Sequence, residues 1–129
     1  MKNKVSLFLD SGAFSAWSKN TTIDIEDYIS FIKENEKYID HYSVLDVIGD
    51  AEGTLKNQKI MEKSGLHPIP CFHYGENISY LKEYIDKYDY VALGGMVPIS
   101  SKILILWLDE LFSKYIYLFQ NHKVVGFSC

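Results

Sequence analysis

The chain has 129 residues, of which 47% are hydrophobic and 23% are charged, and its formal net charge is -4. This composition excludes a disordered polypeptide, and the length is that of one domain. All 13 basic residues are lysine, which argues against a dedicated phosphate-binding surface because bidentate phosphate recognition favours arginine. No apolar run reaches the roughly 18 to 20 residues of a membrane span, and the N-terminus lacks the layout of a signal peptide, so we expect a cytoplasmic protein.

The first half of the chain alternates predicted strands with predicted helices. Residues 4–10 form an apolar strand that ends in an acid, and residues 22–24 offer a helix start. Apolar residues then recur at helical spacing up to residue 38 or 39. Residues 41–46 are the second predicted strand. Residues 52–64 are the second predicted helix, with Leu55, Ile60 and Met61 on one side and Gly65 at the position of a left-handed C-cap.

The second half continues the alternation. Residues 68–72 predict a third strand, Asn77 begins the next helix as its cap, and residues 90–93 predict a fourth strand. A turn over residues 98–101 opens a long apolar helix over residues 102–119, and residues 124–127 predict a fifth strand. The long helix is apolar on more than one face, so we expect it to be covered on both sides.

Strands that alternate with helices at this spacing indicate right-handed crossovers and a parallel sheet, hence the α/β class. Two architectures fit: an open doubly wound sheet, or the first part of a (β/α)8 TIM barrel. A barrel typically needs about 250 residues, so a barrel made of residues 1–129 would be a single, incomplete domain. An open edge favours self-association into a homo-oligomer, or a second polypeptide that completes the barrel.

Polar and glycine residues follow successive strands, at the sheet edge where α/β folds usually place their chemistry. Asp10 is the leading candidate for an acid or base, because the small residues Ser11 and Gly12 would let a planar ring approach its carboxylate. A structural alternative is that Asp10 caps the next turn. Phe14 could stack on a ring or could belong to the core.

The second strand end adds two carboxylates, Asp46 and Asp50. Together with Asp10 they could polarise a heterocycle by accepting its N–H protons, or could bind a divalent metal. Asp50 suits a solvated helix cap equally well. His73 comes at the third strand end.

Glycines follow the fourth predicted strand in the run Gly94-Gly95-Met96, where missing side chains would let a ligand lie against the backbone or would simply serve a tight turn. The two cysteines, Cys71 and Cys129, lack metal-ligand spacing, and we expect them to be small buried hydrophobes. The chain contains no P-loop, dinucleotide-binding, zinc-protease or nucleophile-elbow motif, so we expect no cofactor and no resident metal.

Four segments, taken in order, resemble the strand-end motifs of the tRNA-guanine transglycosylase superfamily, and most closely its phage and bacterial branch that acts on DNA: LDSGAFS, LDVIGD, PIPCFHYGE and ALGGM. The segment DSGAFS is similar to the DSGGFQ motif of the tRNA enzymes, and ALGGM is similar to their base-lining glycine pair. The resemblance spans residues 9 to about 127. It implies a (β/α)8 barrel that exchanges guanine in DNA or tRNA for a 7-deazaguanine through a covalent sugar intermediate.

The resemblance also implies roles for the residues. Asp10 would be the acid/base for the departing and incoming bases, and residues 11–14 would shape the pocket. Asp46, or less favourably Asp50, would accept hydrogen bonds from the base edge. His73 falls where the family places a polar base contact of another residue type. Gly94 and Gly95, followed by Met96, would bring backbone groups up to the heterocycle.

Two departures accompany the resemblance. The family's nucleophilic aspartate lies on a later strand, beyond residue 129, and the cysteine-rich zinc site of the tRNA enzymes is absent. We therefore expect a truncated or partner-dependent form, whose activity as an enzyme is open. One alternative function is a metal-assisted hydrolase that uses Asp10, Asp46 or Asp50, and His73. Another is a non-catalytic module that binds a purine or a protein partner.

Overall fold

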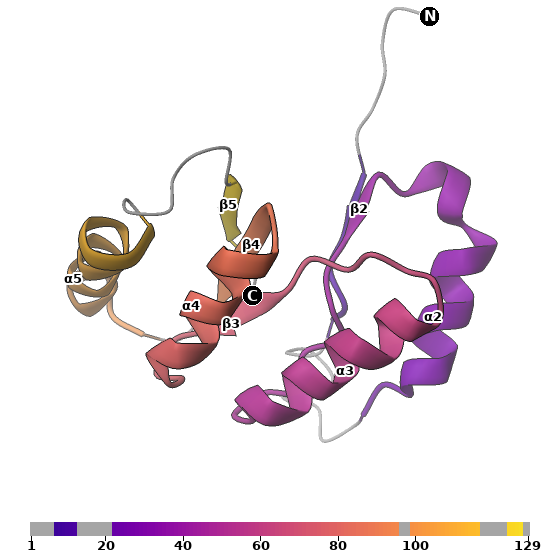
Figure 1. Ribbon diagram of the computed structural model, residues 1–129, viewed down its shortest axis with the longest axis horizontal. Coiled ribbons are helices and arrows are strands. Elements are labelled where there is room, and N and C mark those ends of the chain that lie inside the picture. The colour runs from indigo at the N-terminus through magenta and orange to yellow at the C-terminus, as the bar shows by residue number, and fades with distance from the viewer. Residues whose placement is uncertain (1–6, 13–21, 96–98, 117–123, 128–129) are drawn as a thin grey trace, which may run out of the picture. The chain divides into compact units, whose positions relative to one another are not determined.

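The computed structural model describes residues 7–12, 22–95, 99–116 and 124–127 (Figure 1). The chain divides into two compact units, Met1–Ile69 and Pro70–Cys129, and each is described by itself. Every strand pair among the described residues is parallel, which confirms the α/β class with a parallel arrangement. These strands form one two-stranded and one three-stranded sheet, and the described residues do not close a barrel.

The sheet of the first unit consists of two short strands. β1 (Phe8–Leu9) pairs with β2 (His41–Tyr42), and Phe8 lies opposite His41. The strand predicted over residues 41–46 is shorter in the structure because the backbone after Tyr42 bonds elsewhere. The Val44 amide donates to the Ile69 carbonyl at 2.9 Å, in an isolated parallel bridge next to β2. Residues 4–6 of the first predicted strand lie outside the described residues.

The first helix of this unit, α2 (Ile25–Glu34), begins at Asp24, whose carboxylate accepts a hydrogen bond from the Glu26 amide at 2.8 Å. Its buried side consists of three residues at helical spacing, Tyr28, Ile29 and Ile32. The predicted continuation to residue 38 is a separate short 3₁₀ turn, η1 (Glu36–Tyr38). The helix start in the sequence is thus confirmed, and the helix is shorter than its apolar spacing indicates.

The second helix of this unit, α3 (Ala51–Lys63), buries a largely polar side. Its buried residues are Thr54, Gln58 and Met61, whereas Leu55 and Ile60 are only half-buried. Of the three apolar residues that the sequence places on one side of this helix, Leu55, Ile60 and Met61, only Met61 is buried. Gly65 has a φ of +95°, which confirms the left-handed residue predicted after the helix.

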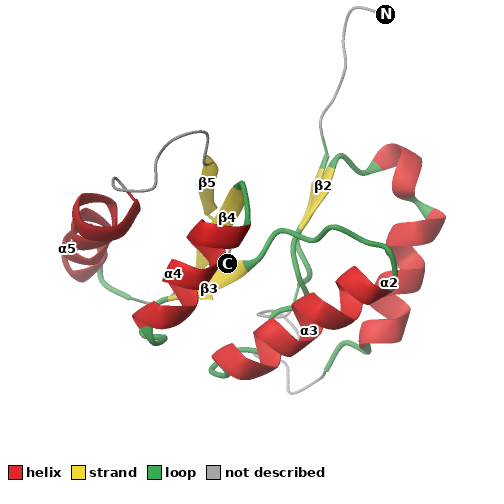
Figure 2. Cartoon of the chain, in the orientation of Figure 1, coloured by secondary structure: helices red, strands yellow, loops and turns green. Residues whose placement is uncertain are grey.

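The second unit carries a three-stranded parallel sheet with β4 at its centre. β3 (Cys71–His73) and β5 (Val124–Phe127) flank β4 (Tyr90–Gly94), in the order β3-β4-β5. The middle of the central strand is apolar and buried, at Val91, Ala92 and Leu93. Figure 2 shows these strands and the helices that connect them.

The helix between β3 and β4 is α4 (Ile78–Lys87), which buries Leu81, Tyr84 and Ile85. It begins as the sequence predicts, because the Asn77 side-chain oxygen accepts a hydrogen bond from the Ser79 amide at 2.9 Å.

Asn77→Ala is expected to lower the free energy of unfolding by about 1 kcal/mol, because the Ser79 amide loses its acceptor. Asn77→Asp is the matched control: its carboxylate keeps an acceptor at the same place and favours the positive end of the helix. Urea unfolding followed by far-UV circular dichroism measures both variants. An alanine variant as stable as the parent would contradict the capping role.

The predicted long apolar helix is divided in the structure. α5 (Ser101–Leu111) begins after Ser100, whose hydroxyl accepts from the Ile103 amide, and a π-helical segment, η2 (Phe112–Ile116), follows it. The prediction of one continuous α-helix over residues 102–119 is therefore wrong. Several large apolar residues of α5 are exposed, namely Ile103, Ile105 and Leu106. Within the described part of the chain, no helix combines the length and the apolar character that a membrane span requires.

Candidate functional site

The first strand end of the first unit places two neighbouring residues in different environments. Asp10 directly follows β1 and is exposed, whereas Ser11 is buried. The Ser11 hydroxyl donates to Asp46 Oδ1 at 2.8 Å, and the Ser11 amide donates to Ser43 Oγ at 3.2 Å. The sequence assigned Ser11 only the shaping of a pocket. Its observed contact is with the carboxylate that follows the second strand.

The sequence analysis did not identify two further residues of this site, Ser43 and Tyr28. The Tyr28 hydroxyl donates to the Ser43 carbonyl at 2.7 Å. Burial raises the pKa of Tyr28, and the charges of Asp10 and Asp46 act in the same direction, against the hydrogen bond to Ser43. The position of Tyr28 on the apolar side of a helix gave no signal for this role.

The backbone on both sides of Asp46 is fixed by side chains of α3. The Asn57 amide group donates to the Leu45 carbonyl at 2.8 Å, and the Val47 amide donates to Thr54 Oγ1 at 2.9 Å. Asp46 itself is 7% exposed. Its carboxylate is therefore held by the Ser11 hydroxyl from one side while its main chain is held by a helix. Such fixed groups need little reordering when a ligand binds.

Asp50 has a structural role. It is exposed, and its Oδ1 accepts from the Gly53 amide at 3.0 Å, at the N-terminus of α3. A Cβ on Gly53 would lie 2.6 Å from Asp50 Oδ2, so the glycine leaves room for this cap. The capping alternative considered for Asp50 is confirmed. Gly12, beside Ser11, has a φ of +76°, a conformation that favours glycine.

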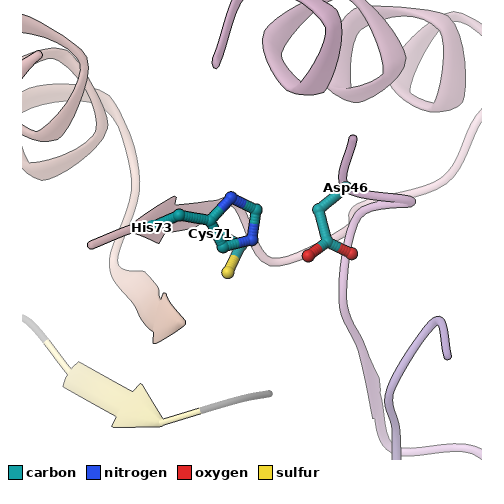
Figure 3. A group of neighbouring side chains, drawn as sticks. All are labelled: Asp46, Cys71 and His73. Carbon is teal, nitrogen blue, oxygen red and sulfur yellow. The ribbon is translucent and has the colours of Figure 1, made fainter. Parts of the chain in front are cut away.

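In the second unit, His73 and Cys71 project from β3 (Figure 3). Both are buried, and the Cys71 sulfur lies within 4.8 Å of a nitrogen of the His73 ring. His73 is paired with Glu76, whose two carboxylate oxygens contact the His73 amide at 3.0 Å and Nδ1 at 3.1 Å. The sequence did not single out Glu76, although it stands three residues after the histidine in the segment HYGE. Asp46, also drawn in Figure 3, belongs to the first unit.

A hydrogen bond from Nδ1–H to a carboxylate fixes the orientation of an imidazole ring and leaves Nε2 as its acceptor atom. Free cysteine behaves as a small hydrophobe when buried, and Cys71 is 1% exposed, as expected from the sequence. The buried histidine is thus a positioned side chain with a defined carboxylate partner.

The glycine pair ends the central strand of this unit. Gly94 is the last residue of β4 and lies opposite His73, and its carbonyl accepts from the Tyr74 amide at 2.9 Å. Gly95 has a φ of +68°, and a Cβ there would lie 2.9 Å from the His73 Cβ. Close packing against His73 thus explains why residue 95 is glycine. Phe14, Met96 and Cys129 lie outside the described residues.

Comparisons of this chain with protein-family models, with curated proteins and with solved structures found no match.

Proposed function

We propose that this chain is a base-exchange glycosyltransferase-like protein, which replaces guanine in DNA or tRNA with a 7-deazaguanine and binds the base near Asp10, Ser11 and Asp46. The proposal includes a partial (β/α) barrel that a second copy or another polypeptide completes. The observation that carries it is the 2.8 Å hydrogen bond from the Ser11 hydroxyl to Asp46, which joins two segments that resemble successive motifs of the guanine transglycosylases.

The chemistry of guanine supports Asp46 as the recognition group. The edge of guanine that pairs with cytosine presents a ring N–H and an amino group, both of which donate. An ionised carboxylate is purely an acceptor and can receive both. An enzyme that exchanges a base must take it out of the stack and read this edge in a pocket. A buried carboxylate with a fixed backbone suits such recognition.

Asp10 supports the second role, that of the acid/base. It directly follows a strand and is exposed to solvent, so that it can exchange protons. Cleavage of a glycosidic bond needs one group to manage the proton of the leaving base and a second group to attack or stabilise the sugar. The resemblance matches no residue of this sequence to the attacking carboxylate. The direct test of the proposal is therefore a measurement of base binding.

The resemblance alone supports the base contacts proposed for four further residues, namely His73, Gly94, Gly95 and Met96. The Glu76 partner of His73 and the packing of Gly95 against His73 give two of these residues structural roles in the second unit. The permanently charged side chains available to the phosphates of a nucleic acid are all lysines, because the chain contains no arginine. The base is therefore the ligand with which to begin.

Titration calorimetry of the full chain with guanine and with 7-cyano-7-deazaguanine tests the proposal. We expect both bases to bind, and Asp46→Asn to weaken binding about tenfold or more, because a charge-assisted hydrogen bond to the base edge is lost. EDTA is expected to leave the affinity unchanged, since the proposed recognition uses carboxylates and not a metal.

Asp24→Asn is the matched control. It removes the same charge from the same unit, and asparagine caps a helix as well as aspartate does, so α2 keeps its start. We expect this variant to bind the bases like the parent. If neither base binds the parent, or if both variants lose affinity equally, the proposed recognition by Asp46 is wrong. Binding abolished by EDTA would favour the metal-assisted hydrolase instead.

A further inference from the structure

A cavity of about 290 Å³ lies within the second unit, and its lining residues include none of Asp10, Ser11 and Asp46. It is bounded by the end of β3 with the turn that follows it, by the first residue of α4, and by α5. Its walls combine aromatic side chains with carboxylates: Phe72, Tyr74, Glu76, Trp107 and Glu110.

The aromatic wall is built around Trp107 of α5. The Trp107 ring stacks on Phe72, with ring centroids 6.4 Å apart and planes 15° from parallel. It meets Tyr74 edge to face, with centroids 5.1 Å apart and an angle of 66°. Phe72 is buried beneath this wall, whereas Trp107 and Tyr74 are half-buried. Two π systems at a steep angle to one another therefore border the cavity.

The charged part of the wall is acidic. The Glu76 side chain is 8% exposed and is oriented by its two contacts with His73. Glu110 lies on α5 and pairs with Lys114 at 3.3 Å, near the solvent. Among the described residues that line the cavity, none is a lysine. A ligand in this cavity thus meets aromatic faces and two carboxylates.

We propose that this cavity binds an organic cation of the alkylammonium class, with its methyl or methylene groups against Trp107 and Tyr74 and its charge balanced by Glu76 and Glu110. The faces of aromatic rings carry negative electrostatic potential, and tryptophan and tyrosine are the strongest partners of an ammonium group. Neighbouring carboxylates add attraction in a partly desolvated site. An anion would be repelled by the same wall, whereas a neutral apolar ligand would gain no electrostatic attraction from its carboxylates.

The experiment compares choline with 3,3-dimethylbutan-1-ol, its neutral isostere with carbon in place of nitrogen. Titration calorimetry of the full chain at low salt gives both affinities. Proton NMR of the N-methyl groups reports whether they lie against an aromatic ring, because ring currents shift their signal upfield. We expect choline to bind saturably with an upfield shift, and the isostere to bind about tenfold more weakly.

Two variants locate the site. Trp107→Leu is expected to abolish the upfield shift, and circular dichroism checks that this variant folds. Glu110→Gln is conservative and weakens choline binding about threefold, since it removes one partly exposed charge. Glu83→Gln is its matched control, because Glu83 pairs with Lys87 at the same 3.3 Å on α4 and does not line the cavity.

Equal affinities for choline and its isostere would overturn the proposal, because the site would then recognise shape without charge. Absence of saturable choline binding would overturn it as well, and so would equal losses in Glu110→Gln and Glu83→Gln. Failure here leaves the proposed base binding unaffected, since that test rests on Asp46.

Discussion

Leu81→Ala is expected to lower the free energy of unfolding by about 2–5 kcal/mol. The Leu81 side chain on α4 is 0% exposed, so its truncation removes buried apolar surface and leaves a cavity. Close-packed interiors relax only partly around such a cavity, which adds to the loss of transfer free energy. A decrease of this size is a large fraction of the stability of a small domain. Denaturant unfolding followed by far-UV circular dichroism measures it.

Leu106→Ala is the matched control, because it makes the same substitution in a helix of the same unit. Leu106 lies on α5 and is 68% exposed. We expect a change within about 0.5 kcal/mol, since alanine is also a good helix former. A large loss at Leu106 would show that the exposed side of α5 is covered in solution, which a dependence of the unfolding midpoint on protein concentration would confirm.

Stability is expected to fall steeply above the ordinary pKa of tyrosine, 10.0. Among the residues that the structure describes, each unit contains one buried tyrosine, Tyr28 or Tyr84, whose pKa is raised mainly by burial. In the unfolded chain these phenols lose their protons near pH 10, whereas in the folded chain they stay protonated to higher pH. The contribution of each is thus complete below the unfolded pKa and is lost as the pH rises toward the folded pKa. The loss is about 1.4 kcal/mol per pH unit for each tyrosine.

The unfolding free energy measured in urea at about pH 9 and about pH 11 tests this slope. Tyr28→Phe is expected to be less stable than the parent at the lower pH, because the Ser43 carbonyl loses its donor at 2.7 Å. It is also expected to lose less stability between the two pH values. Tyr38→Phe is the control, since Tyr38 is 59% exposed. Equal slopes in the parent and in Tyr28→Phe would contradict the raised pKa.

Local signals in the sequence predicted helix starts well. Asp24 and Asn77 both cap the helices that they were expected to begin, and Gly65 has the expected left-handed conformation. These features depend on a few neighbouring residues, so no knowledge of the tertiary structure is needed to recognise them. The predicted strands 90–93 and 124–127 also appear with nearly the expected bounds.

Tertiary contacts explain the failures. The sequence grouped Leu55 and Ile60 with Met61 on one side of α3, yet Thr54 and Gln58 are buried with Met61 instead. Thr54 bonds to the Val47 backbone and Gln58 donates to the Pro68 carbonyl, in the segments before and after the helix, and apolar periodicity cannot reveal such contacts. The end of α5 at Leu111 was missed for a different reason, because no glycine or proline marks the boundary.

The sequence identified several residues of the candidate site, but it did not reveal which of them contact one another. Asp10 and Asp46 were found because each follows an apolar strand. The bond between Ser11 and Asp46 was not, since it joins residues 35 positions apart. Tyr28, Ser43 and Glu76 were missed because a phenol, a hydroxyl and a carboxylate in these settings are common without any function. Only their partners in the structure distinguish them.

The polar buried side of α3 has a consequence for the precision of the fold. An apolar helix can slide along its neighbour by one turn and still bury similar surface. α3 is matched to single backbone atoms, because Asn57 donates to the Leu45 carbonyl and Gln58 donates to the Pro68 carbonyl at 2.8 Å. A shift of one turn would break both bonds at once and leave buried carbonyls without donors. These bonds therefore hold the helix in one register, and they hold the backbone of Asp46 in place with it.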